Sequence, residues 1–156
     1  MKAIVCRELS GPAALRLEDV PEPRPGPGQV RVRVRACGIN FADSLIARGQ
    51  YQVQPEPPFS PGFEVAGEVL ETGEDVTGFR AGDRVIAITP HGGYAEQVVA
   101  NANRCVAMPA AMPFEQGAAF PVVFGTSHIA LWHRARLRAG ETLVVHGASG
   151  GVGLTA

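Results

Sequence analysis

The chain has 156 residues, with 14 lysines and arginines against 15 aspartates and glutamates, and 46% of its residues are hydrophobic. This apolar content and the net charge of −1 argue against intrinsic disorder, and the missing basic excess argues against nucleic acid as a main partner. No apolar run reaches the ~18 residues of a membrane helix, and the N-terminus lacks the features of a signal peptide. We therefore expect a cytoplasmic protein without a membrane partner.

Short strands separated by turns are predicted for the first two thirds of the chain, in keeping with its 19 glycines and 13 prolines. The clearest strand covers residues 29–36, where Val30, Val32 and Val34 alternate with arginines and give the strand one apolar face. Further strands are predicted at residues 2–7, 15–20, 65–72, 83–89, 94–100 and 105–108. Such regular spacing predicts a small β-barrel or sandwich. A short helix is expected from Phe41 to Arg48, ended by Gly49.

Helices are expected after this region. Pro113 and the residues after it resemble a helix start, and residues 126–138 place apolar side chains at helical spacing before Gly140. Residues 141–146 (ETLVVH) form a continuous apolar run, typical of a strand that is buried on both faces of a parallel sheet.

A glycine-rich turn, HGASGGVGLTA, follows this run. It contains the dinucleotide-binding pattern in two overlapping registers, Ala148-x-Gly150-x-x-Gly153 and Gly151-x-Gly153-x-x-Ala156, and both remain open. Small residues allow a sharp turn, a close approach of the backbone to a pyrophosphate, and packing of the following helix on the strand. The pattern predicts a cofactor site made by Ser149, Gly150, Gly151, Val152 and Gly153. The alternative is a glycine-rich connection without a ligand.

Three stretches together carry a resemblance to a known family: CGINFAD, PGFEVAGEV followed by AGDRV and GGYAEQVVA, and GETLVVHGASGGVG. In this order they resemble the medium-chain dehydrogenase/reductase superfamily, and within it the zeta-crystallin-like NADPH:quinone oxidoreductases. The resemblance implies a mostly β fold with some α: a GroES-like β-barrel domain over residues 1–123, then the opening helix, strand and glycine turn of a truncated Rossmann domain over residues 124–156. We therefore expect the N-terminal half of an enzyme whose full-length form is a homodimer.

Metal binding is not expected. The three cysteines, Cys6, Cys37 and Cys105, lie far apart and form no C-x-x-C pair, so reduced structural thiols are predicted. The zinc-dependent branch of the superfamily has a cysteine three residues after its Cys-Gly-Ile start and a histidine in a Gly-His-Glu motif. This chain has Asn40 and Phe63 at those positions, so the resemblance implies a zinc-independent protein in which Glu64 is structural.

The resemblance also suggests site residues. It implies that Asn40 is a polar contact to cofactor or substrate, that Tyr51 lies in the substrate cleft, and that Thr126 lies near the nicotinamide. Leu45 stands where several relatives have a tyrosine, which leaves Tyr51 as the candidate phenolic proton donor. Simpler interpretations stay open: Asn40 as a helix N-cap, Tyr51 as ordinary packing, and Thr126 as the start of its helix.

The implied activity is hydride transfer from NADPH to a quinone or enone, with enoyl thioester reduction and a non-catalytic truncated barrel as alternatives. The chain by itself is expected to be inactive. NADPH is expected on the resemblance alone, because the residue that separates NAD from NADP follows ~20 positions after the turn. Residues after about Gly140 are expected to be disordered or paired with a second copy of the chain. His128 and His133 are expected on different faces of their helix.

Overall fold

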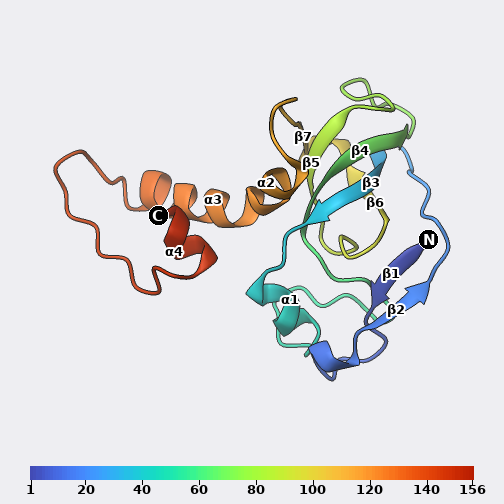
Figure 1. The fold of residues 1–156 in the computed structure, drawn as a ribbon, viewed down its shortest axis with the longest axis horizontal. Coiled ribbons are helices and arrows are strands. Elements are labelled where there is room, and N and C mark those ends of the chain that lie inside the picture. The colour runs from blue at the N-terminus through green and yellow to red at the C-terminus, as the bar shows by residue number, and fades with distance from the viewer.

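The structure is a computed structural model that describes residues 1–156. Figure 1 shows a large β-rich lobe from which a helical arm extends. The strands are β1 (Lys2–Val5), β2 (Arg16–Asp19), β3 (Gln29–Cys37), β4 (Glu64–Thr72), β5 (Arg84–Ile88), β6 (Gln97–Asn101) and β7 (Cys105–Ala107). The helices are η1 (Pro12–Ala14), α1 (Phe41–Ile46), η2 (Ala102–Arg104), α2 (Phe114–Ala119), α3 (Pro121–His128), the π-helix η3 (Ile129–Arg134) and α4 (Gly151–Thr155).

The main sheet has five antiparallel strands in the order β6-β3-β4-β5-β7. Its core is built mainly from valines on alternate positions of these strands, among them Val30, Val32, Val65 and Val85, all fully buried. The arginines between them lie on the other face, where Arg31 and Arg35 pair with glutamates. The strands therefore form where the alternation predicts them, because one face of each can be buried.

The strands do not close into a hydrogen-bonded barrel. β1 and β2 form a separate two-stranded ribbon, which meets the rest of the lobe through two isolated bridges, Ala3 with Ala95 and Cys6 with Phe59. The prediction of a mostly β fold with a few helices is confirmed, whereas the closed barrel is not formed. Two single bridges satisfy few backbone groups, so packing side chains such as Cys6, Ile46 and Phe59 hold the ribbon and α1 together.

The arm, residues 121–156, begins at Pro121, directly after α2 (Figure 1). α2 packs against the sheet through Gly117, where an added Cβ would lie 2.8 Å from Met108 Sδ and 3.1 Å from Ala66 Cβ. The helix predicted over residues 126–138 is wrong in its limits. It begins at Pro121, whose fixed φ suits a first helical turn, and ends at Arg134 as a π-helix.

Residues 141–146 form no strand, contrary to the prediction. Five of these six residues are exposed, and no strand of this chain lies beside them to share hydrogen bonds. The glycine turn is followed by α4 as predicted, and α4 packs on α3 through hydrogen bonds from Ser127 Oγ to the Val152 carbonyl and from Thr155 Oγ1 to the Val123 carbonyl. Neither disorder nor pairing with a second copy is tested by these contacts.

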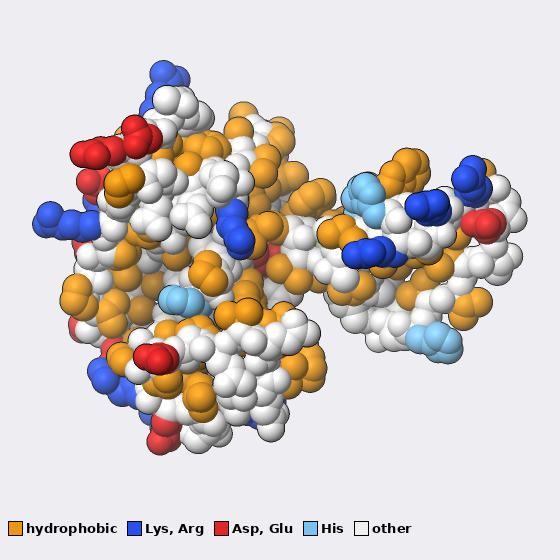
Figure 2. Space-filling view, turned by 180° about the vertical axis from the view of Figure 1, so that it is seen from behind, with side chains coloured by type: hydrophobic (Ala, Val, Ile, Leu, Met, Phe, Trp, Pro, Cys, Tyr) orange, Lys and Arg blue, Asp and Glu red, His pale blue; other side chains and the backbone are white.

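Figure 2 shows the large lobe and the arm joined by a narrow neck, with hydrophobic side chains exposed on both parts. All three cysteines are free thiols, as expected. None of the helices combines the length and the apolar character that crossing a bilayer requires.

Candidate functional site

A cluster of hydrogen-bonded polar side chains, centred on Glu64, lies at the neck where the arm meets the large lobe. Glu64 is the first residue of β4 and is only 2% exposed. Its Oε1 accepts a hydrogen bond of 2.8 Å from Asn40 Nδ2, and its Oε2 accepts one of 2.8 Å from the backbone N–H of Val122. The backbone is fitted closely around this side chain, because a Cβ on Gly38 would lie 2.7 Å from Glu64 Cγ and Cδ. Both carboxylate oxygens are thus occupied.

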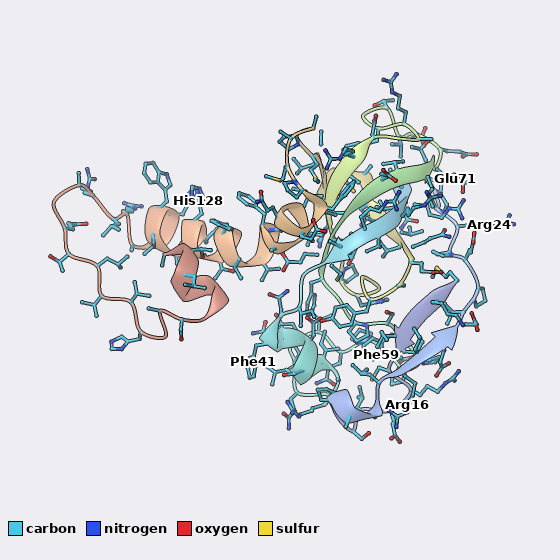
Figure 3. All side chains as sticks on the ribbon, in the orientation of Figure 1. Arg16, Arg24, Phe41, Phe59, Glu71 and His128 are labelled. Atoms are coloured by element: carbon cyan, nitrogen blue, oxygen red, sulfur yellow. The ribbon has the colours of Figure 1, made fainter.

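Asn40 lies between the end of β3 and the start of α1, as its N-cap residue. Asp43 completes this cap, since its Oδ2 accepts the backbone N–H of Asn40 at 2.7 Å. Asn40 is therefore the N-cap residue of α1, which confirms that alternative, while its side-chain Nδ2 donates to Glu64. Its neighbours Ile39 and Phe41 are 85% and 79% exposed. Phe41 lies at the end of α1 nearest the arm (Figure 3), so an oriented amide is flanked by open apolar surface.

Asp43 is a second buried carboxylate and collects three donors. It accepts the Asn40 N–H, the Gly62 N–H at 3.1 Å through Oδ1, and the Tyr94 hydroxyl at 2.9 Å through Oδ2. Gly62 has φ +97°, and a Cβ there would lie 2.9 Å from Gly93 Cα, so the loop approaches Asp43 as only glycine allows. Asp43 and Tyr94 therefore fix the loops that surround Asn40.

Burial changes the acidity of these groups. Desolvation raises the pKa of Glu64 above its ordinary value, against the hydrogen bonds from Asn40 and Val122 that lower it. Desolvation, together with the bond to Asp43, raises the pKa of Tyr94, so this phenol is a weak proton donor. Desolvation and the charges of Asp43 and Glu64 raise the pKa of the Cys37 thiol to about 12, so it stays protonated at neutral pH.

Tyr51 and Thr126 make no hydrogen bond to the side chains of this cluster. Tyr51 is half-buried and its ring packs on Phe63, with ring centroids 5.7 Å apart, in keeping with the packing alternative. Thr126 lies within α3, so it does not begin the helix, and its exposed hydroxyl donates to the Val122 carbonyl at 2.5 Å. The structure brings neither residue into hydrogen-bond contact with Asn40.

The glycine turn is shaped by close backbone contacts. At Gly151, an added Cβ would lie 2.8 Å from Val123 Cγ1. At Gly153, an added Cβ would lie 2.8 Å from Ala148 Cα and would also overlap the Gly147 carbonyl oxygen. Gly150 precedes the helix in an extended conformation, with φ −81° and ψ 163°. Ser149, Gly150 and Val152 are exposed, so the turn presents backbone to solvent, as close approach of a phosphate requires.

The prediction for His128 and His133 is wrong. Their ring centroids are 5.3 Å apart in an edge-to-face arrangement, because η3 is a π-helix and places residues five apart on one side. His128 lies on the helices of the arm (Figure 3) and lines an apolar cavity of about 810 Å³ with Phe124, Trp132 and other residues near or within the arm. No three His, Cys, Asp or Glu side chains gather as a metal-binding group, and Phe63 holds an aromatic ring beside Tyr51.

Comparison with known proteins places this geometry in a family. Residues 26–110, more than half of the chain, match the family described as "Alcohol dehydrogenase GroES-like domain". The chain belongs to this family. The GroES-like part therefore comprises β3 to β7 with α1 and the Glu64 cluster, except for the contact to Val122.

Relatives extend the similarity over nearly the whole chain. A quinone oxidoreductase of Lama guanicoe is 44% identical over 158 residues, covering 100% of this chain and 48% of the relative. The human synaptic vesicle membrane protein VAT-1 homolog-like protein has a TM-score of 0.96 at 38% identity, covering 99% of this chain and 50% of that one. The quinone oxidoreductase of Thermus thermophilus, solved also with NADPH, has a TM-score of 0.86 at 41% identity, covering 99% and 48%.

The chain thus spans about half the length of the curated relatives it matches. Its fold is that of medium-chain dehydrogenases/reductases, as the sequence resemblance predicted. Sequence reasoning named Asn40 but missed the roles of Asp43 and Tyr94. A signal for Asp43 was present, since an acidic residue three positions after an N-cap asparagine is typical of a capping box.

Proposed function

We propose that the chain supplies the GroES-like domain (residues 1–123) and the start of the nucleotide-binding domain (residues 124–156) of a zinc-independent, NADPH-dependent oxidoreductase. Its substrates are quinones or other conjugated carbonyls such as enones. The observation that carries the proposal is the Asn40 amide, fixed by Glu64 and flanked by the exposed Ile39 and Phe41. Relatives named quinone oxidoreductases support the substrate class.

The residues of the turn fit a dinucleotide. Gly151 and Gly153 have no room for a Cβ, while Ser149 and Gly150 leave backbone exposed ahead of α4, so the turn would hold a pyrophosphate. When bound, NADPH supplies the hydride that reduces the acceptor. Thr126 is proposed as a contact near the nicotinamide, since rotation of its exposed hydroxyl away from the Val122 carbonyl would free it as a donor.

Orientation is the main contribution of the protein in this proposal. Asn40 presents its amide from a fixed position, and the apolar side chains of Ile39 and Phe41 exclude water from the face of a flat acceptor. A quinone that gains a hydride becomes a stabilised phenolate-type anion, so a hydroxyl, an amide or solvent suffices to donate to it. Tyr51 is the proposed cleft residue, whereas the hydroxyl of Tyr94 is held by Asp43.

The test follows NADPH absorbance at 340 nm with 1,4-benzoquinone, using the protein expressed from its own gene and, in parallel, the 156-residue chain. We expect sustained NADPH oxidation by the former and little by the latter. Asn40→Ala should lower kcat/KM by about 10- to 100-fold, because one positioned polar contact is lost. The matched control Asn103→Ala changes an exposed asparagine outside the cluster and should leave the rate unchanged. Oxidation at the buffer rate with quinones and enones alike would overturn the proposal.

A further inference from the structure

Glu64 binds groups on both sides of the neck. Asn40, which it holds through Oε1, precedes α1 in the large lobe, whereas Val122, which it holds through Oε2, is the second residue of α3 in the arm. Glu64 itself belongs to β4 in the centre of the main sheet. One buried carboxylate therefore connects the sheet, the candidate site and the arm that carries the glycine turn.

The bond to Val122 has a definite physical role. The first N–H groups of a helix have no partner within the helix, and Pro121 has no N–H. α3 also has no N-cap side chain of its own, because Phe120 precedes Pro121. Glu64 supplies the missing acceptor, and its negative charge lies at the helix end where an anion is favoured. The direction in which α3 leaves the large lobe thus depends on Glu64.

The bond to Asn40 fixes the other group. An amide has a donating and an accepting end, and turning the amide over would place Oδ1 against the acceptor-only carboxylate. Asn40 Nδ2 therefore stays on Glu64, and Oδ1 has a set direction. Because Glu64 is buried, water competes little for either bond.

We propose that Glu64 is a positioning residue, whose single carboxylate sets both the orientation of the Asn40 amide and the direction of α3. The two parts of the proposed site, the Asn40 amide and the arm with its glycine turn, are coupled through it. The catalytic consequence rests on the proposed function, but the coupling concerns contacts of this chain alone.

Glu64→Gln is the informative change, because glutamine has one accepting oxygen and one donating NH₂ group. Two donors, Asn40 Nδ2 and the Val122 N–H, then face one acceptor. Either one of the two bonds is lost, or the Asn40 amide turns over and its Oδ1 accepts from the new NH₂ group, while the volume is kept. The matched control is Glu68→Gln, the same change on the same strand, where the carboxylate pairs with Arg35 in a more exposed position.

The coupling is measured by hydrogen exchange and ¹H–¹⁵N spectra of the 156-residue chain. In Glu64→Gln, exchange of the Val122 amide should accelerate by roughly 10- to 100-fold, or the Asn40 side-chain resonances should move to free-amide positions, while core amides such as that of Val32 stay protected. Glu68→Gln should do neither. Unchanged Val122 exchange together with unchanged Asn40 resonances would overturn the proposal.

Asn40→Ala gives a second measurement if the Glu64 variant does not fold. Asn40 makes no hydrogen bond to Val122, so a coupled carboxylate predicts a shifted Val122 amide resonance in this variant, and an uncoupled one predicts none. The enzymatic readout is separate: Glu64→Gln should lower kcat more than it raises KM for the quinone. If no variant oxidises NADPH while the exchange data hold, the proposed function fails and the coupling stands.

Discussion

Gly38→Ala tests the packing of the Glu64 cluster. Gly38 has an ordinary backbone conformation, so alanine meets no strain there, but its Cβ would lie 2.7 Å from Cγ and Cδ of Glu64. Carbon atoms in contact stay ~3.5–4.0 Å apart, so the Glu64 side chain must move and break its two bonds of 2.8 Å.

The magnitude follows from these bonds. Each hydrogen bond to a charged group contributes about 1.5–3 kcal/mol, and replacing glycine by alanine returns about 0.4–1 kcal/mol by restricting the unfolded chain. We expect Gly38→Ala to lower the free energy of unfolding by about 2–5 kcal/mol. With a urea m-value of about 2 kcal/mol/M, the midpoint of urea unfolding, followed by circular dichroism, should fall by about 1–2.5 M.

Two controls make this prediction specific. Gly78→Ala places a Cβ with nothing within 4 Å and should change the free energy of unfolding by less than about 0.5 kcal/mol. In a Glu64→Ala background the obstructing side chain is gone, so Gly38→Ala should cost less than about 0.5 kcal/mol. Additive costs of Gly38→Ala and Glu64→Ala would show that the reasoning from this contact is wrong.

Two further predictions concern the same cluster. Tyr94→Phe removes the hydroxyl that donates to the Asp43 carboxylate, so it should lower the free energy of unfolding by about 1.5–3 kcal/mol. The control Tyr51→Phe keeps the ring that packs on Phe63 and should change the free energy of unfolding by less than about 0.5 kcal/mol. Urea unfolding measures both variants, and equal effects would contradict a stabilising bond from Tyr94 to Asp43. Burial raises the pKa of Glu64, so the folded chain holds this proton more tightly than the unfolded chain, and the free energy of unfolding falls as pH rises from about 4.5 through the raised pKa. The free energy of unfolding of the unchanged chain minus that of Glu64→Gln should therefore decrease as pH rises across this window. An increase would contradict a raised pKa of Glu64.

Much of the fold could be predicted from the sequence, because its signals are local. Alternating valines locate β3 to within a residue, Gly49 follows the end of α1, and the glycine turn precedes α4. A strand whose side chains alternate between a buried and a wet face carries this information in its own short stretch of sequence. Asn40 was also predicted as a site residue, because it stands at a helix start within a family motif.

The polar cluster could not be predicted in the same way. The bond from Asn40 to Glu64 joins residues 24 apart, and the bond from Tyr94 to Asp43 joins residues 51 apart. Side-chain partners at such separations depend on how the strands are ordered in the sheet, which no local pattern states. The expectation that Glu64 is structural was therefore incomplete, since its two partners became visible only in the fold.

The sequence by itself determined where the strands and turns lie and which residues form the glycine turn. The tertiary structure decided that residues 141–146 form no strand, that β1 and β2 stay outside the main sheet, and that His128 and His133 come together. An apolar run becomes a strand only beside another strand that takes its hydrogen bonds, and the i to i+5 hydrogen bonds of a π-helix bring side chains five residues apart to one side.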